Sequence, residues 1–398
     1  MNDPRSPLSP SQMQLAALVA VGTLGAAPVV IGPVMVGGLI DEFALSPRQA
    51  GLVYAAEMAG IGLATLAGVF VVHRWNRRGL LIAAVLLLLM AYLASATAVA
   101  TLSAAALFGV LLAIWLVGGL GSGTATSTMK AAVAGTRDPD RVFAFYSMLM
   151  LAFGALAVPS LTQLRLAHGL AYVYLAMAVL TAALLTVSRA WPARTAVRTR
   201  IGGASPDRPR TLQITAIAAL GCYFLGYSGV WPYAERLAIA AGLSASEAGR
   251  SVGLGLLAGG LGAGLAAAIS TRWGRVVPLA LGLPLALAGL ALLAVGEPAA
   301  YRAGVVLFVG SAFFSFPYVL GALAALDPAG RVIMAGLVVQ SVCMAIAPAV
   351  AAQLASIDYL SVPWQGLVFF VLCTALSLYA GRRVRALTAS TSHSPHVH

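Results

Sequence analysis

The glutamate Glu57 is the sharpest chemical feature of the sequence, because it lies inside a long apolar run at 48–72. It falls about nine residues from the start of that run, which corresponds to roughly 14 Å of helix. A bare carboxylate in such a run is costly, so the side chain should face protein or water, where carboxyls serve proton relays. We therefore predict that Glu57 binds and releases protons. The alternative is that it packs in its protonated form against a neighbouring helix.

Lys130 is the only lysine among the 24 basic residues, and it follows several hydroxyl side chains in the apolar run 104–131. A cation with hydroxyls nearby can bind an anionic or polar ligand. We predict ligand contacts by Thr124, Ser127 and Lys130. A lysine that snorkels to the membrane boundary explains the same pattern equally well.

Aromatic side chains form a second candidate surface for a ligand. Tyr223, Tyr227 and Trp231 recur at every fourth position, which places them along one stripe of a helix. We predict ligand contacts by Tyr223 and Tyr227, although packing also explains such stripes. Trp231 and Glu235 lie near the outer end of the run, where an aromatic belt at the membrane surface is expected. Three further residues complete the predicted ligand set: Tyr54, Phe314 and Gln340.

Composition identifies the surroundings of the chain as a lipid bilayer. Of the 398 residues, 60% are hydrophobic and only 9% are charged, against about 25% charged in soluble domains. The net charge of +12 could suggest nucleic acid, but the basic residues lie in short gaps between apolar runs, as membrane topology requires. The three cysteines lie inside apolar runs without paired spacing, so neither a disulfide framework nor a metal site is expected.

Twelve apolar runs are long enough to cross a membrane, since a spanning helix needs about 20 residues. We predict an all-α membrane protein with an N-terminal six-helix bundle (1–188), a basic linker (189–210), a C-terminal six-helix bundle (211–381) and a disordered tail (382–398). The predicted spans are 13–40, 48–72, 79–99, 104–131, 142–165, 169–188, 211–235, 246–270, 276–295, 302–325, 331–355 and 363–381.

The arginines predict the orientation of these spans. If the N-terminus is cytoplasmic, 18 arginines lie on the inner side and five on the outer side. Basic residues accumulate on the cytoplasmic side of membrane proteins. We therefore expect a multi-pass protein of a bacterial-type inner membrane, with both termini in the cytoplasm.

The second half of the chain repeats the first. A basic loop after the second span returns 198 positions later, with Arg74, Trp75 and Arg77 reappearing as Arg272, Trp273 and Arg275. The same offset places Gly255 at the position of Glu57, so the repeating fold unit does not need the carboxyl. Duplicated units of this length indicate an internal repeat.

Two six-helix copies in the same orientation resemble the two halves of the major facilitator superfamily. The loop between the second and third helices of that family reads G-x-x-x-D-R-x-G-R-R/K, and residues 73–78 match its arginines. His73 and Thr271 stand where the family has Asp, and Asn76 stands where it has Gly. The resemblance implies a conformational latch at the cytoplasmic side that lacks its usual carboxylate. Its arginines here are Arg74, Arg77, Arg272 and Arg275.

The first span is similar to that of the twelve-helix drug:proton antiporters, on the evidence of the stretch from Gly22 to Pro28 together with Pro33. Gly154 and Pro159 match part of the antiporter motif in helix 5, but its Gly-Pro pair is missing. The resemblance implies a monomeric secondary transporter that moves a small organic molecule by alternating access and is coupled to protons, with export slightly favoured over import. Proton-coupled uptake of an organic acid is the alternative. A non-transporting receptor or a lipid-handling protein on the same fold is the alternative of another class.

Enzymatic motifs are missing from the sequence. It has no phosphate-binding P-loop, no Ser/His/Asp order and no Glu/His metal spacing. We expect no enzyme activity, no cofactor and no bound metal. The expected partners are a small-molecule substrate, protons and the lipid bilayer.

Overall fold

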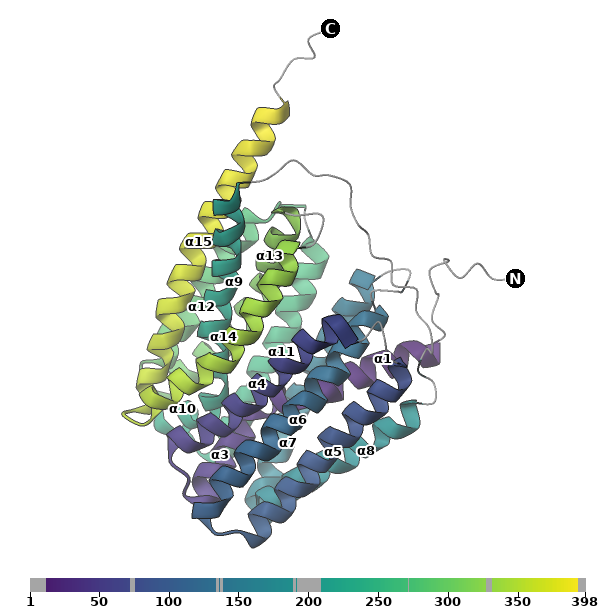
Figure 1. Cartoon of the computed structure of the whole chain (residues 1–398). Coiled ribbons are helices and arrows are strands. Elements are labelled where there is room, and N and C mark those ends of the chain that lie inside the picture. The colour runs from purple at the N-terminus through teal and green to yellow at the C-terminus, as the bar shows by residue number, and fades with distance from the viewer. Residues whose placement is uncertain are drawn as a thin grey trace, which may run out of the picture.

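The computed structural model describes residues 12–71, 76–133, 136, 139–188, 191, 209–270, 272–326 and 331–392. Every element of regular structure within these residues is a helix (Figure 1). Eleven segments of the described chain are long and apolar enough to cross a membrane. The expected all-α membrane fold is therefore confirmed.

The N-terminal half consists of residues 12–188. Its first segment is divided into α1 (Gln12–Gly25), α2 (Ala27–Val30) and α3 (Gly32–Phe43). The five helices that follow are α4 (Pro47–Val71), α5 (Arg77–Thr101), α6 (Ala104–Val133), α7 (Pro139–His168) and α8 (Leu170–Val187).

The C-terminal half begins at Arg210. Its first segment runs from α9 (Arg210–Val230) through η2 (Trp231–Tyr233) into α10 (Ala234–Ala240). It is followed by α11 (Ala245–Ile269), α12 (Val276–Leu293), α13 (Pro298–Leu326), α14 (Arg331–Ala355), η3 (Tyr359–Ser361) and α15 (Val362–Ser392).

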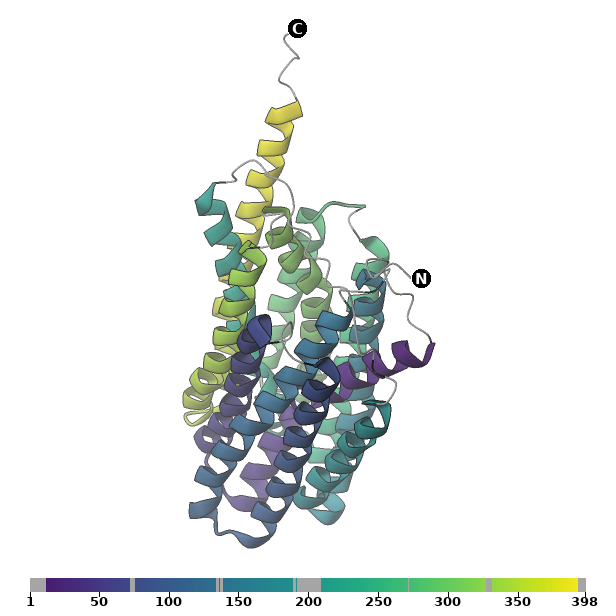
Figure 2. The same ribbon diagram turned by 45° about the vertical axis from the view of Figure 1, so that its right-hand side comes forward.

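The first segment is broken, so the prediction of one continuous helix over 13–40 is wrong. Its α-helical stretches end at Gly25 and Val30. Pro28 and Pro33 explain the breaks, because a proline inside a helix lacks the N–H donor and clashes with the carbonyl four residues earlier. As a result, α1 is turned away from the direction of α3 (Figures 1 and 2). Hydropathy alone does not detect such a break.

The repeat that the sequence predicts is visible in the turns between the first and second segments of each half. Ala44 and Gly242, which are 198 positions apart, both have a left-handed backbone with φ of 51° and 87°. Ser46 and Gln49 bond each other reciprocally at the start of α4, and Ser244 and Glu247 form the matching capping box of α11. The same local signals therefore start the second span of each half.

The two halves pack along two pairs of helices, α4 against α14 and α7 against α11. Glycines on α11 permit close approach on two sides. A Cβ at Gly253 would lie 2.8 Å from the carbonyl oxygen of Ala155 in α7, and one at Gly262 would lie 2.1 Å from that of Gly310 in α13. Small residues serve this purpose in membrane helices, where backbones in contact gain packing energy.

The bundle has two ends, which we call the distal side and the linker side. On the distal side α3 meets η2 and α10. On the linker side α8 ends at Val187 and α9 begins at Arg210. On this side α15 continues to Ser392 and extends past the neighbouring helices (Figure 1). The expectation of disorder from residue 382 is therefore wrong as far as Ser392, and residues 393–398 lie outside the described part.

Candidate functional site

Glu57 lies in the interior of the N-terminal half. Its side chain is only 1% exposed, and neither carboxylate oxygen has a hydrogen-bond partner. Helices α4 and α6 are nearly in backbone contact around it, since a Cβ at Gly119 would lie 2.2 Å from the Glu57 carbonyl oxygen. Protein, one of the two predicted environments, surrounds this carboxyl, but the structure gives it none of the bonds that a purely packing role would require.

Three aromatic residues from three further helices form a cluster near Glu57. Trp115 of α6 packs edge-on against Tyr92 of α5, with ring centroids 5.4 Å apart, and lies 6.0 Å from Tyr174 of α8. Trp115 lies one turn of α6 before Gly119, the glycine that meets the Glu57 carbonyl. All three side chains are fully buried, and their polar atoms make no hydrogen bond of good geometry. Sequence reasoning missed this cluster, because its members lie in separate apolar runs.

The break in the first segment is held by both halves of the protein. Pro33 has no N–H to donate to the Val29 carbonyl, and two other donors bond this oxygen instead. Tyr54 Oη of α4 donates at 3.3 Å and Trp231 Nε1 of η2 donates at 2.8 Å. A carbonyl oxygen has two lone pairs and can accept both bonds. Gly32 leaves the room that Tyr54 needs, because a Cβ there would lie 2.4 Å from the tyrosine ring.

The aromatic stripe of α9 faces this break and lies in the protein interior. Tyr227 stacks between Tyr223 and Trp231 at centroid distances of 6.2 Å and 6.0 Å. Tyr223 Oη donates to the Ala312 carbonyl at 2.9 Å. Trp231 is 2% exposed, so the prediction that it belongs to an aromatic belt at the membrane surface is wrong. The partner half, rather than lipid headgroups, receives its indole N–H.

The other predicted ligand residues do not all join this centre. Phe314 lies against Tyr318 and against Gly282 of α12, whereas Phe313 contacts Tyr227 and Phe316 contacts Tyr223. Gln340 is half-buried on α14, and its amide makes only a weak contact of 3.8 Å with the Met344 sulfur.

The predicted hydroxyls of α6 are divided between two faces of the helix. Ser122 Oγ donates to the Gly25 carbonyl at 2.6 Å, so this face of α6 meets α1. Thr124 is two positions along and therefore lies on the opposite face. Ser127 Oγ is buried without a partner, whereas Lys130 is exposed near the linker-side end of α6. Only Lys130 among these three is open to a ligand from that side.

The predicted latch is partly described. Arg74 lies outside the described residues. Arg77 is buried in the first turn of α5, after Asn76, whose side chain caps the helix. Arg272 is exposed and Arg275 is half-buried, and neither forms an ion pair with a carboxylate in the part of the chain that the structure describes.

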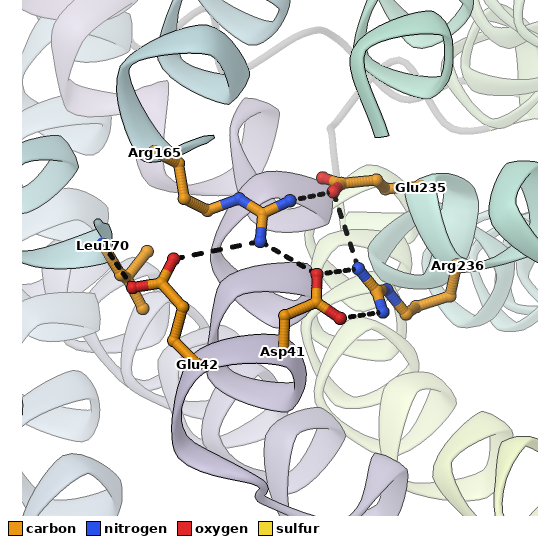
Figure 3. Close-up of polar contacts among 6 residues, drawn as sticks. All are labelled: Asp41, Glu42, Arg165, Leu170, Glu235 and Arg236. Atoms are coloured by element: carbon orange, nitrogen blue, oxygen red, sulfur yellow. Dashed lines mark hydrogen bonds and ion pairs between the residues drawn. The ribbon is translucent and has the colours of Figure 1, made fainter. Parts of the chain in front are cut away.

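An ionic cluster joins the two halves on the distal side (Figure 3). Arg236 of α10 donates two hydrogen bonds to Asp41 of α3, at 2.6 Å and 2.5 Å. Arg165 of α7 bonds Asp41 at 3.0 Å and also bonds Glu235 of α10. Each half thus provides an acid and an arginine to the other. Glu235 is 1% exposed, so it lies at the distal end of its segment but inside the protein rather than at the membrane surface.

Two glycines of α3 make room for the ionic cluster. A Cβ at Gly37 would lie 2.9 Å from Glu235 Oε1, and one at Gly38 would lie 2.9 Å from Arg165 Cδ. Glu42 accepts the Leu170 N–H at 2.7 Å and so ties α3 to the start of α8. A larger residue at Gly37 would hold the two halves apart, and one at Gly38 would displace Arg165 within the N-terminal half.

Asp41 remains charged within this cluster and lies beyond the predicted first span. Partial burial raises its pKa, but hydrogen bonds and charges from Arg236 and Arg165 outweigh burial and hold the pKa below its ordinary value. Lowering the pH through the physiological range therefore leaves the Asp41 bonds in place. Asp41 itself therefore does not bind a proton in that range.

The fold and the site define a membrane transporter, in which two helical halves close on the distal side around a broken first segment. A sequence model of the Major Facilitator Superfamily matches residues 15–352. The chain therefore belongs to this superfamily, whose members are transporters and not enzymes. No curated protein sequence matches the chain.

Solved structures of low sequence identity share the fold. The xylose transporter XylE from E. coli, in a partially occluded inward-open conformation, has a TM-score of 0.73 at 16% identity, and the alignment covers 92% of this chain and 96% of XylE. Its inward-open structure also scores 0.73, at 14% identity over 93% and 94% of the two chains. A D-xylose-proton symporter scores 0.69 at 14% identity over 93% and 96%.

Proposed function

We propose that this protein is a proton-coupled secondary transporter that moves a small organic molecule by alternating access, with Glu57 as the proton-binding carboxyl. The observation that carries the proposal is the complete burial of Glu57 without a hydrogen-bond partner, one turn from Tyr54 at the break of the first segment. An ionised carboxylate in such a place is costly. Glu57 is therefore neutral in this conformation and must gain water or a partner before it releases its proton.

The conformation itself supports a cycle of this kind. We infer that the linker side is cytoplasmic, because the arginines gather there, and that the ionic cluster closes the external side. The structure would then be inward-facing, and the likeness to inward-open XylE agrees with this assignment. In the outward-facing state the cluster must separate, which also removes Trp231 from the Val29 carbonyl and loosens the helix break beside Glu57.

We propose export by proton antiport as the direction, on the resemblance of the first span to drug:proton antiporters. The second candidate is proton-coupled uptake. It is favoured by the exposed Lys130 on the linker side, which could bind an organic acid, and by the fold likeness to a D-xylose-proton symporter. The proposed substrate contacts are Tyr54, which lies one turn from Glu57, and the stacked pair Tyr223 and Tyr227. A monomer in the plasma membrane suffices, since one chain contains both halves.

Proton movement in liposomes tests the proposal. Purified protein and its Glu57→Gln variant are reconstituted, and a panel of aromatic acids and lipophilic cations is added to one side. We expect one compound to drive a proton flux that Glu57→Gln abolishes while still binding the compound. The sign of the flux separates antiport from symport.

Glu247→Gln is the matched control, because this exposed carboxylate pairs with Arg302 inside the C-terminal half. It should transport like the unmodified protein. If Glu57→Gln still moves protons with its substrate, Glu57 is a packing residue and the coupling proposal fails. If a compound binds to the unmodified protein but no flux occurs, the receptor alternative replaces transport.

A further inference from the structure

A hollow on α15 lies at the linker-side end of its membrane span. It has a volume of about 540 Å³ and is lined by Ala375, Leu378, Tyr379, Arg382 and Arg383. These positions recur every three to four residues and therefore share one face of the helix. The apolar span of this segment ends at Arg383. The floor of the hollow thus lies within the hydrocarbon layer, and its two guanidinium groups lie at the level of the headgroups.

The lining is amphipathic. Ala375 and the 49% exposed ring of Tyr379 present apolar surface, while Arg382 and Arg383 are exposed at the rim. The guanidinium carbon of Arg383 stands 5.6 Å from the centre of the Tyr379 ring. This cation–π contact fixes the charge above the apolar floor. A ligand that matches both parts needs an anionic head and an apolar tail.

Neighbouring helices add positive charge at the same level. Helix α15 packs against α9 and α12. Pro209 directly precedes the first residue of α9, and Arg275 directly precedes that of α12. Gly381 of α15 lies against Val276, the first residue of α12, and Arg210 is exposed at the start of α9. Neither helix start has a side-chain cap. Uncapped N-termini present free N–H donors and a partial positive charge.

Acidic residues do not balance these charges in the described part of the chain. None of Arg210, Arg382 and Arg383 takes part in an ion pair there. Guanidinium groups bind phosphate oxygens in bidentate geometry. An arginine that only snorkels to the boundary requires no hollow beneath it, so the apolar floor points to a ligand with chains.

We propose that this hollow binds one anionic phospholipid, with its phosphate on Arg382 and Arg383 and an acyl chain along Ala375 and Leu378. The site is independent of Glu57 and of transport direction. Free phosphate shares the head chemistry, but it would leave the apolar floor unused. A diffuse attraction of anionic lipid to basic residues would not depend on the shape of the floor.

Lipid titration of the full chain in phosphatidylcholine nanodiscs tests the site, with bound phosphatidylglycerol counted by native mass spectrometry. We expect Arg382→Gln/Arg383→Gln to weaken phosphatidylglycerol binding roughly 25-fold, because each juxtamembrane arginine contributes about fivefold near an anionic surface. Arg48→Gln/Arg250→Gln, which removes two exposed arginines on the distal side, should bind like the unmodified protein. Equal binding by both double variants would overturn the proposal.

Two further measurements distinguish a lipid site from a diffuse electrostatic attraction and from a phosphate site. Ala375→Trp fills the floor without changing charge, and it should weaken phosphatidylglycerol binding by at least fivefold on the same scale. If Ala375→Trp binds normally, the attraction is diffuse and the site is refuted. Glycerophosphate, the headgroup without chains, should not compete with the lipid. Full competition by glycerophosphate would make this a phosphate site instead. The thermal unfolding midpoint in phosphatidylcholine alone verifies that each variant is folded.

Discussion

The first segment of each half occupies the same place in the repeat, yet the two have opposite chemistry. With the 198-residue offset, Gly25, Val29, Pro33 and Gly37 correspond to Tyr223, Tyr227, Trp231 and Glu235. The small residues break the first segment of the N-terminal half and make it narrow. The large residues of the first segment of the C-terminal half fill the space that remains. Trp231 bonds the Val29 carbonyl, and Glu235 lies over Gly37. Duplicated helices have thus become complementary surfaces.

The largest effect on this complementarity is expected from the loss of a charge in the ionic cluster. In Glu235→Leu the Arg165 guanidinium, whose side chain is 1% exposed, loses its buried partner. Removing one member of a buried pair costs about 3–5 kcal/mol, so we expect a shift of at least 100-fold toward the state that is open on the distal side. Spin labels at Ser103 and Glu297, in the distal loops of the two halves, report the separation.

Two variants sharpen that result. Arg165→Leu combined with Glu235→Leu should recover much of the closed population, because replacing both members of a buried pair is tolerated better than replacing one. Glu247→Gln removes the charge of an exposed pair within one half and keeps a side-chain oxygen for the capping box with Ser244, so it should leave the label distance unchanged. A closed distal side in Glu235→Leu would mean that packing alone holds the halves together.

An intermediate effect is expected when the glycine that faces Glu235 is replaced by a larger residue. In Gly37→Leu the new Cβ would lie 2.9 Å from Glu235 Oε1. Overpacking of this kind costs about 1–3 kcal/mol, so transport should fall roughly tenfold and the distal labels should move apart. The same substitution at Gly109, where a Cβ would meet nothing within 4 Å, is the control. Unchanged transport in Gly37→Leu would show that the space is not needed.

The smallest effect is expected from pH acting on the Asp41 bonds of the ionic cluster. The pKa of Asp41 is lowered by Arg236 and Arg165 against the opposing effect of burial. Its stabilising contribution is therefore complete above its ordinary pKa of about 3.9 and is lost only as the pH falls through the lowered value. In a Glu57→Gln background the carboxyl carbon NMR signal of Asp41, assigned by its loss in Asp41→Asn, should show no titration between pH 8 and pH 5. Titration of Asp41 within that range would reassign proton binding from Glu57 to Asp41.

The sequence predicted the fold well, because a bilayer imposes span length and composition on every helix. It also predicted that Glu57 faces protein or water. It did not reveal that Trp231 and Glu235 meet the other half, since depth along one helix does not show whether its neighbour is lipid or protein. Phe314 stays a predicted ligand contact, but Phe313 and Phe316 are the residues that reach Tyr227 and Tyr223, because the rotation of α13 about its axis depends on its packing partners.

The contrast between Gly37 and Glu235 also has an evolutionary consequence. A dimer of two N-terminal halves would place glycine against glycine. It would contain neither the tryptophan N–H donor nor the buried glutamate. A dimer of two second halves would bring two carboxylates and two indoles into the same space. Neither half could therefore form this distal contact with a second copy of itself. The two halves depend on each other for it, so selection at these positions acts on both halves together.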